Sequence, residues 1–373
     1  MIRKLSTLVA AFVLAIFAVA AVEIAWPRQQ PSSEQAAPAS WSFAASGDSR
    51  NCGDVVMPGI AAGVLAHHAS FYWHLGDLRA IYNFDEDMQH EPEHREKPMS
   101  ILDYQNSAWD DFIDNQITPF ETVPFFLGIG NHETISPKSR EEFIQQFADW
   151  LDAPVLQSQR LADNRRDHRV RAYYHWVMNR VDFIYFDNAT PDQFDGGQMK
   201  WAKRVIEHDA KDPAISTIVA GMHRALPDSI SFGHSMNESP EGVESGRRVY
   251  QYLLGAQNEG HKKVYVLASH SHFYMENIYN TEYWRAHGGI LPGWIVGTAG
   301  AVRYPLPEGS NQARAAKTNV YGYLIGTVGP TGEIQFEFQP LAESDVPSEV
   351  TARFTPDFVH WCFAENSQAQ AEK

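Results

Sequence analysis

Cysteine is scarce in this chain: Cys52 and Cys362 are the only two among 373 residues. Neither belongs to a Cys-x-x-Cys pair, so the sequence excludes a zinc ribbon and a thioredoxin-like redox site. In an oxidising compartment the two thiols would form one disulfide, which would hold the C-terminal tail near the first loop of the fold. Two unpaired, partly buried thiols are the alternative, and the sequence leaves both open.

Positive charge is also in short supply, because 30 Lys and Arg residues face 46 Asp and Glu residues, for a net charge of -16. A nucleic-acid-binding surface needs a basic face, so we expect no nucleic-acid footprint. Anionic substrates stay possible, since bound cations reverse the local field. With 20% charged and 44% hydrophobic residues the chain is typical of globular proteins, and its length allows one large catalytic domain or two small ones.

The N-terminal segment is not expected to belong to the fold. A basic start, an apolar run from Leu5 to Val22 and a small-residue Ala-Val-Ala pattern within it are typical of a secretory signal peptide. The run is also nearly long enough to span a bilayer, so retention as a membrane anchor is the alternative. We therefore predict a signal peptide or N-terminal membrane anchor over residues 1–26 and a Pro/Ser/Gln-rich linker over residues 27–40. The protein would be exported, periplasmic or extracellular, with or without a membrane tether.

Beyond the linker, apolar runs of strand type alternate with segments of helical periodicity. The predicted strands are Trp41–Ser46, Ser70–Leu75, Phe125–Leu127, Ala214–Ala220, Val264–Ala268 and Ile290–Val296, with hairpins formed by Val170–Trp176 and Arg180–Phe186 and by Gly322–Val328 and Ile334–Phe338. This order predicts an α/β fold with a mixed sheet, or two packed sheets, and helices outside. We expect one catalytic domain over residues 41–345 and a C-terminal tail over residues 346–373.

Polar side chains that bind cations stand at the ends of the predicted strands. In chain order they are Asp48, Asp77, Asn131, His223, and His270 with His272. Ligands collect at the carboxyl ends of strands in α/β sheets, so we expect these side chains to converge on one site. Carboxylate, carboxamide and imidazole without thiolate suit Zn, Mn or Fe better than Ca or Mg.

Each of these residues also has an ordinary structural interpretation when it is taken alone. Asp48 or Asp77 could cap a helix, His223 could be a hydrogen-bonded core histidine, and the His pair could be surface residues. The joint pattern favours a metal site. In an extended segment His270 and His272 would point to one face, within reach of two adjacent ions, and two-metal sites serve phosphoryl hydrolysis.

The blocks around these residues resemble those of a known family. Gly-Asp-Ser-Arg, Gly-Asp-Leu-Arg, Gly-Asn-His-Glu, Gly-Met-His and Ser-His-Ser-His, in this order, resemble the ordered blocks of the calcineurin-like metallophosphoesterases. Four further segments resemble those of the purple acid phosphatase branch: residues 173–176, 181–187, 198–201 and 297–300. The resemblance implies a four-layer α/β/β/α sandwich of two mixed β-sheets with helices outside. It also implies hydrolysis of a small phosphate ester by a hydroxide bound to two metal ions, which would be Fe, Mn or Zn.

The resemblance further implies a role for each site residue. Asp77 would bridge the two metals, Asp48 and His272 would hold the first, and Asn131, His223 and His270 would hold the second. His132 would act near the leaving group as an electrostatic stabiliser or general acid, because an imidazole can donate a proton near neutral pH. Glu133 would orient His132.

Two residues depart from the family pattern. Arg50 stands where the family has a His in the first block, and Ala80 stands where the purple branch has a Tyr. The first metal therefore lacks one protein ligand, and Tyr82, Asn51 or water are the candidates to replace it. Arg50 cannot coordinate a metal, because a guanidinium offers only donors.

Arginine side chains near the predicted site suggest a substrate-binding role. Arg50 could hold a phosphate in bidentate fashion, and Arg224 is similarly placed after a ligand residue. Arg79 is expected to form a surface salt bridge instead. The incomplete first metal site keeps an alternative function open: a metal-binding pseudoenzyme or binding protein on the same fold.

Two long loops, residues 81–100 and 227–245, are expected to shape the pocket, since long loops carry specificity. Within the first, the acidic stretch of residues 85–97 is predicted to be a solvated surface loop.

Overall fold

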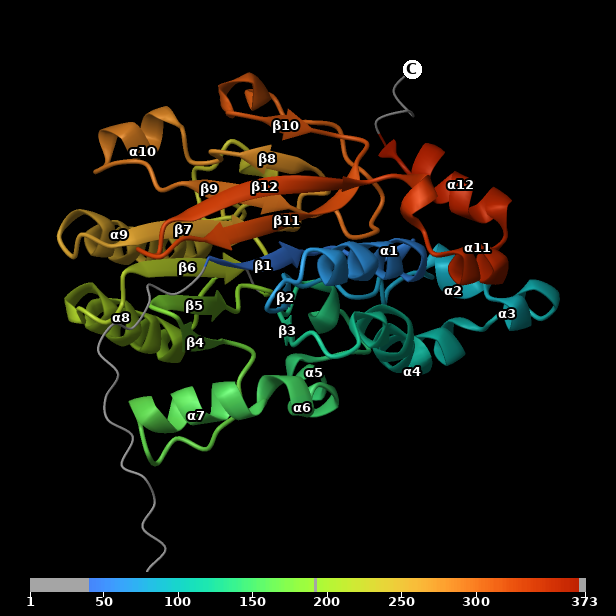
Figure 1. Cartoon of the computed structure of the whole chain (residues 1–373), viewed down its shortest axis with the longest axis horizontal. Helices are drawn as coiled ribbons and strands as arrows, with labels where there is room; N and C mark the ends of the chain where they lie inside the picture. Colours follow the sequence, from blue (N-terminus) through green and yellow to red (C-terminus); the bar gives the residue numbers. More distant parts are fainter. Residues whose placement is uncertain (1–39, 191–192, 369–373) are drawn as a thin grey trace, which may run out of the picture. The chain divides into compact units, whose positions relative to one another are not determined.

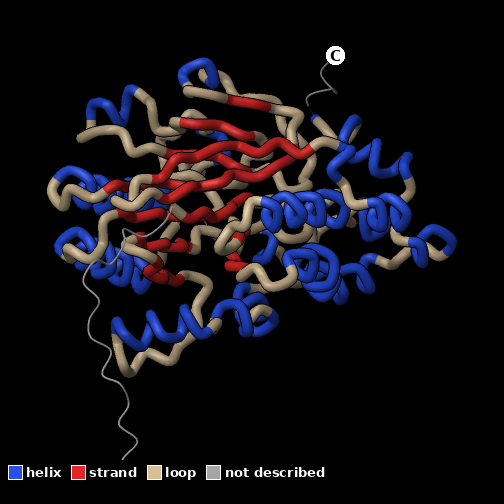
Figure 2. The backbone as a smooth tube through the Cα atoms, in the orientation of Figure 1, coloured by secondary structure: helices blue, strands red, loops and turns tan. Residues whose placement is uncertain are grey.

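The computed structural model describes residues 40–190 and 193–368, all of which belong to one compact unit. The predicted signal peptide or anchor, and the linker up to residue 39, lie outside the described residues. Within the described ranges, no helix is both long and apolar enough to cross a membrane. Strands gather in the interior of this unit and helices surround them (Figure 2).

The first sheet has five strands in the order β12-β11-β1-β2-β3. Their bounds are β1 (Trp41–Ser46), β2 (Tyr72–His74), β3 (Phe125–Leu127), β11 (Tyr321–Val328) and β12 (Ile334–Leu341). β1, β2 and β3 run parallel, while β11 pairs antiparallel with β1 and with β12, which confirms the predicted late hairpin. Ser46, His74 and Leu127 are aligned across the three parallel strands, so the loops that follow them leave from one edge.

The second sheet has seven strands in the order β10-β8-β9-β7-β6-β5-β4. Their bounds are β4 (Tyr174–Met178), β5 (Val181–Phe186), β6 (Thr217–Met222), β7 (Lys263–Ala268), β8 (Tyr274–Glu276), β9 (Gly293–Val296) and β10 (Ala316–Lys317). β5, β6, β7 and β9 run parallel. The predicted hairpin of β4 and β5 is confirmed, although its turn residues are Asn179 and Arg180, which both have positive φ.

Alternating side chains on the strands pack the two sheets face to face. On β5, Phe183 faces the first sheet, where its ring centroid lies 5.0 Å from that of Phe43 on β1 and 5.0 Å from that of Phe71. The neighbouring residues Ile184 and Phe186 belong to a second core on the other face of the sheet. Because successive strand residues point to opposite faces, one apolar strand serves both cores.

Helices cover the outer faces of both sheets (Figure 1). α8 (Gly196–Lys211) and α9 (Pro240–Asn258) pack on the second sheet. α1 (Gly53–Ala66) and α4 (Ile101–Phe112) pack on the first sheet. The shorter helices are α5 (Arg140–Gln146), α6 (Ala148–Leu151), α7 (Pro154–Asp163), α10 (Glu282–Ala286), α11 (Ser348–Phe354) and α12 (Pro356–Ala364). The predicted four-layer α/β/β/α sandwich is confirmed.

The acidic insertion differs from its prediction. Residues 85–97 form two short helices, α2 (Glu86–His90) and α3 (Pro92–Glu96), and Asp85 and Asp87 are fully buried. The buried carboxylates pair with a cation that lies elsewhere in the sequence, so the solvated loop expected from charge alone is wrong.

That cation is Arg79, which was expected at the surface and is instead fully buried. Its guanidinium lies 3.0 Å from Asp87 and 2.5 Å from Asp54, and it also contacts Asp111. A buried charge must be paired, so these carboxylates hold Arg79 in place. The cluster thereby ties the loop after β2 to α1, α2 and α4.

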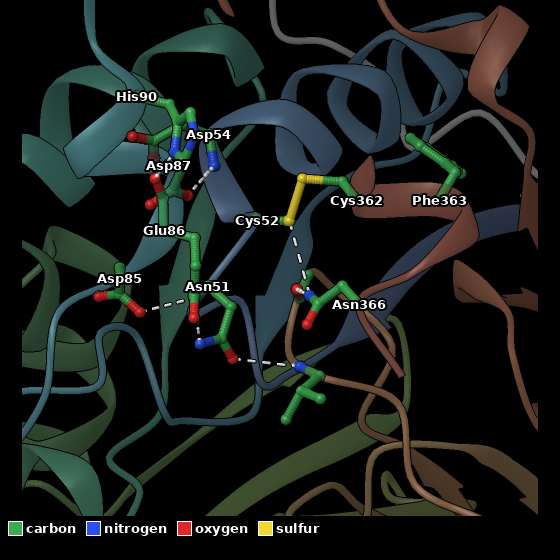
Figure 3. The surroundings of a disulfide bond; sticks show 12 residues. Asn51, Cys52, Asp54, Asp85, Glu86, Asp87, His90, Cys362, Phe363 and Asn366 are labelled. Carbon is green, nitrogen blue, oxygen red and sulfur yellow. Dashed lines mark hydrogen bonds between the residues drawn. A yellow bond between two sulfur atoms is a disulfide. The ribbon is translucent and has the colours of Figure 1, made fainter. Parts of the chain in front are cut away.

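The tail folds back onto the first loop of the domain. Cys52 and Cys362 form a disulfide with a sequence separation of 310, which confirms one of the two predicted alternatives. Figure 3 shows the bond between the start of α1 and α12, with Asn366 next to Cys52. The bridge therefore fixes α12 beside the loop that carries Asp48 and Arg50.

We predict that replacing both cysteines, Cys52→Ser with Cys362→Ser, lowers the free energy of unfolding by about 2–5 kcal/mol, because the unfolded chain regains the entropy that the cross-link removes. Denaturant unfolding of both proteins without reductant measures the difference. Reductant should shift the midpoint of the wild type and leave that of the variant unchanged. Equal midpoints for the oxidised wild type and the variant would contradict this role.

Candidate metal centre

The loops that follow β1, β2, β3, β6 and β7 meet where the two sheets end. They bring together all the residues predicted as metal ligands: Asp48, Asp77, Asn131, His223, His270 and His272. Three of these residues, Asp48, Asp77 and His270, have positive φ values of 61°, 60° and 66°. Non-glycine residues in this conformation cost of order 1–3 kcal/mol and cluster at functional sites.

Lone pairs converge at one point of this edge. His223 Nδ1 lies 3.0 Å from the carbonyl oxygen of Leu75, which can only accept, so Nδ1 carries a proton. The other ring nitrogen, Nε2, lies 3.2 Å from Asp77 Oδ1, and 3.1 Å from both Asn131 Oδ1 and His270 Nδ1. Ligand atoms of Asp77, His223 and His270 all lie within 4.8 Å of one another. A cation bound among these atoms would satisfy all of them.

The electrostatics of this point also favour positive charge. Burial opposes ionisation of Asp77, but the neighbouring His132, His223 and Arg50 outweigh it and hold the pKa of Asp77 well below its usual range. Burial likewise opposes protonation of His223, yet the carboxylate of Asp77 raises its pKa. Burial lowers the pKa of His270 well below its usual value, and neutral imidazole is the form that binds metals.

Gly130 and Glu133 fix the loops around this point. A Cβ atom on Gly130 would lie 2.3 Å from Asp77 Oδ1 and 2.9 Å from His223 Cε1, so only glycine leaves room for the cluster. Glu133 accepts hydrogen bonds from the backbone N–H groups of Asp77, Leu78 and Gly130 at 2.7–2.9 Å. Glu133 thus joins two loops, which differs from its expected contact with His132.

The predicted first metal position has a different environment. His272 Nδ1 donates to the carbonyl of Val302 at 2.6 Å, so its Nε2 offers a lone pair. That Nε2 lies 3.2 Å from Asp48 Oδ1 and 3.2 Å from an Arg50 guanidinium nitrogen. Arg50 Nε lies 3.9 Å from Asp77 Oδ2. The ligands implied for the first metal lie together, but a guanidinium stands among them.

Asn51 and Tyr82, the side chains proposed to replace the missing ligand, have contacts of their own. Asn51 donates to Glu86 through Nδ2 and accepts from the backbone of Val302 through Oδ1, so both ends of its amide are engaged (Figure 3). The ring of Tyr82 lies beside His132, 5.2 Å between centroids, and the side chain is 60% exposed. Both side chains therefore have other contacts.

His132 holds Arg50 in this geometry. Its Nδ1 donates to the carbonyl of Ala80 at 2.7 Å, and its Nε2 accepts from Arg50 at 2.6 Å. Burial lowers the pKa of His132, and the nearby Arg50 charge acts in the same direction. Its implied role as a general acid stays a prediction. A general acid must donate a proton, whereas Nε2 here accepts a hydrogen bond from Arg50.

Arg224 pairs with Glu238 at 2.7 Å, and its substrate-binding role also stays a prediction. His234 and Tyr304 were not singled out from the sequence. The His234 ring lies 5.6 Å from that of His270, and the Tyr304 ring stacks on His272 at 4.0 Å. Neither residue directly follows one of the strands that end at the site, so the strand-end pattern gave no signal for them.

Comparison with known proteins supports the fold. No family model matches the chain, and no curated protein matches it. A purple acid phosphatase from yellow lupin (Lupinus luteus) seeds has a similar structure, with a TM-score of 0.54, 15% identity, and coverage of 82% of this chain and 52% of that one. The chain thus matches about half of the length of the lupin protein, and at this identity the likeness shows the fold alone.

Two other solved structures match at TM-scores below 0.5 and carry no weight here. They are PhoD (0.49, 13% identity, 91% of this chain and 79% of that one) and a dimetal phosphatase from Danio rerio (0.48, 10% identity, 80% and 95%). The two sheets and the likeness to the lupin purple acid phosphatase therefore confirm the implied four-layer fold.

We predict that Gly130→Ala weakens metal binding by about 10–100-fold, the usual effect of disturbing the surroundings of metal ligands. The added methyl would displace Asp77 or His223. Titration of the metal-free protein with Mn²⁺ or Zn²⁺ measures the affinity, and circular dichroism checks folding. Gly196→Ala is the matched control, because a Cβ there meets nothing within 4 Å. A folded Gly130→Ala variant with wild-type metal affinity would contradict a metal site at this point.

Proposed function

We propose that this chain, which has the calcineurin-like metallophosphoesterase fold, is a metal-dependent hydrolase of phosphate esters. The observation that carries the proposal is the convergence of Asp77 Oδ1, Asn131 Oδ1, His223 Nε2 and His270 Nδ1 at the strand ends. This oxygen and nitrogen set suits Zn, Mn or Fe. A metal ion bound there polarises a phosphoryl oxygen and lowers the pKa of a bound water.

The chain's own residues would bind and orient the ester. Arg50 presents a planar guanidinium beside the metal position, and such a group matches two phosphoryl oxygens. Its Nε atom is buried and has no hydrogen-bond partner among the described residues, so one donor is available to a ligand. His132 holds the guanidinium in place by accepting from it. The guanidinium of Arg50 and the bound metal ion would make the centre attractive to an anion despite the net charge of -16.

Export is part of the proposal. A disulfide is typical of oxidising compartments, and the sequence of residues 1–26 has the pattern of a signal peptide or membrane anchor. The protein would then work in the periplasm or outside the cell, with or without a tether. Cell fractionation of the full chain and of a chain without residues 1–26 tests this. Equal cytoplasmic retention of both would contradict export.

A metal-binding protein without hydrolytic activity is the second candidate. The contacts of Arg50 favour it, because they engage His132 Nε2 and His272 Nε2, which the resemblance assigns to catalysis and to the first metal. Both candidate functions require a bound metal ion, and only the first includes hydrolysis of a phosphate ester.

The test is hydrolysis of an aryl phosphate monoester and diester by metal-free protein reloaded with Mn, Zn or Fe. We expect activity that depends on added metal. Asp77→Asn should lower it by roughly 100-fold or more, since even residues around metal ligands contribute 10–100-fold. Asp149→Asn, at an exposed position on α6, is the matched control and should keep wild-type activity. Folded, metal-loaded protein that hydrolyses neither substrate would favour the second candidate.

A further inference from the structure

Arg50 stands among the residues that the family resemblance assigns to the first metal ion, because it contacts His272 and lies 3.9 Å from Asp77. We infer that the centre takes a single metal ion, at Asp77, Asn131, His223 and His270, and that the guanidinium of Arg50 is the second cation of the site. The inference rests on the proposed function for its catalytic meaning, whereas the number of bound ions stands on geometry alone.

The lone pairs that a first metal would need are already used. His272 Nε2 and His132 Nε2 each face a guanidinium nitrogen of Arg50, at 3.2 Å and 2.6 Å. In both rings the other nitrogen lies against a backbone carbonyl, so these Nε2 atoms are the acceptors. A metal on His272 would sit ~2.0–2.1 Å from Nε2, inside the space that Arg50 fills.

Charge leads to the same conclusion. Arg50 is 6% exposed, and a guanidinium is not deprotonated in proteins. The guanidinium is therefore permanently positive. A divalent ion beside it would be repelled strongly, since water no longer screens charges at this depth.

Asp77 connects the two cations. Its Oδ1 faces His223 at 3.2 Å, on the side of the metal position. Its Oδ2 has no hydrogen-bond partner among the described residues, and it lies 3.9 Å from Arg50 Nε. Asp77 would thus bridge a metal ion and a guanidinium, where the family fold implies a bridge between two metals.

The anchoring of its loop keeps Arg50 in this position. Cys52, close behind Arg50 in the chain, is fixed by the disulfide to α12. The backbone of Asn51 donates to Asp85 at 2.6 Å, so the loop is also attached to the insertion. A swing of Arg50 out of the site on metal loading would give two ions, which the experiment detects.

The experiment counts ions in the full chain. Metal-free protein is saturated with Mn²⁺, freed of excess, and analysed by elemental analysis and by electron paramagnetic resonance. We expect about one ion per chain and the signal of an isolated Mn²⁺ for the wild type. Arg50→His, which restores the imidazole of the family pattern, should bind two ions and give the signal of a coupled pair. Arg50→Lys, which keeps the charge without the ring, is the matched control and should stay at one.

Two ions in the wild type, or none, would overturn the inference. One ion in a folded Arg50→His variant would overturn the claim that Arg50 is what excludes the first metal. If that variant does not fold, the wild-type count still decides. One ion without hydrolysis would refute the proposed function and leave this inference standing. Two ions with hydrolysis would refute this inference and support the proposed function.

Discussion

The buried carboxylate of Asp77 is the charge on which the rest of the site depends. A carboxylate in a fully buried position is costly unless cations or donors compensate it. Here His223 and the backbone of His132 face Oδ1, while Arg50 lies on the side of Oδ2. Metal binding beside Oδ1 would complete this compensation, which explains why neutral ligands such as Asn131 gather there.

The fold serves to hold that arrangement. The parallel strands β1, β2 and β3 end side by side, so the loops with Asp48, Asp77 and Asn131 lie at one edge of the first sheet. The histidines follow β6 and β7, which are neighbours in the facing sheet. Glu133 joins the second and third loops through backbone donors. Outside the centre, the Arg79 cluster and the disulfide fix the loops after β2 and β1. The loops of the site are therefore held by hydrogen bonds, ion pairs and a disulfide in addition to any metal contact.

The order of strands and helices predicted an α/β fold with one mixed sheet or two packed sheets, and the family resemblance implied the sandwich. The convergence of the metal residues could be predicted because polar residues at strand ends are a local feature of the sequence. Sequence reasoning missed β8 and β10, which are too short to show a period. It also placed residues 85–97 in solvent, since charge in a sequence predicts exposure unless the buried partner is known. That partner, Arg79, comes from another segment. The absence of the family His at position 50 was visible, but the position of the Arg50 guanidinium depends on His132 and His272 and required the structure.

We infer that one metal ion binds among Asp77, Asn131, His223 and His270 while Arg50 fills the neighbouring position. Anomalous diffraction from crystals grown with Mn²⁺ tests it most directly, because it locates each ion against its ligands. We expect a single anomalous peak at those four side chains, with the Arg50 guanidinium still in contact with His132 and His272. A second peak between Asp48 and His272, with Arg50 turned away, would contradict it.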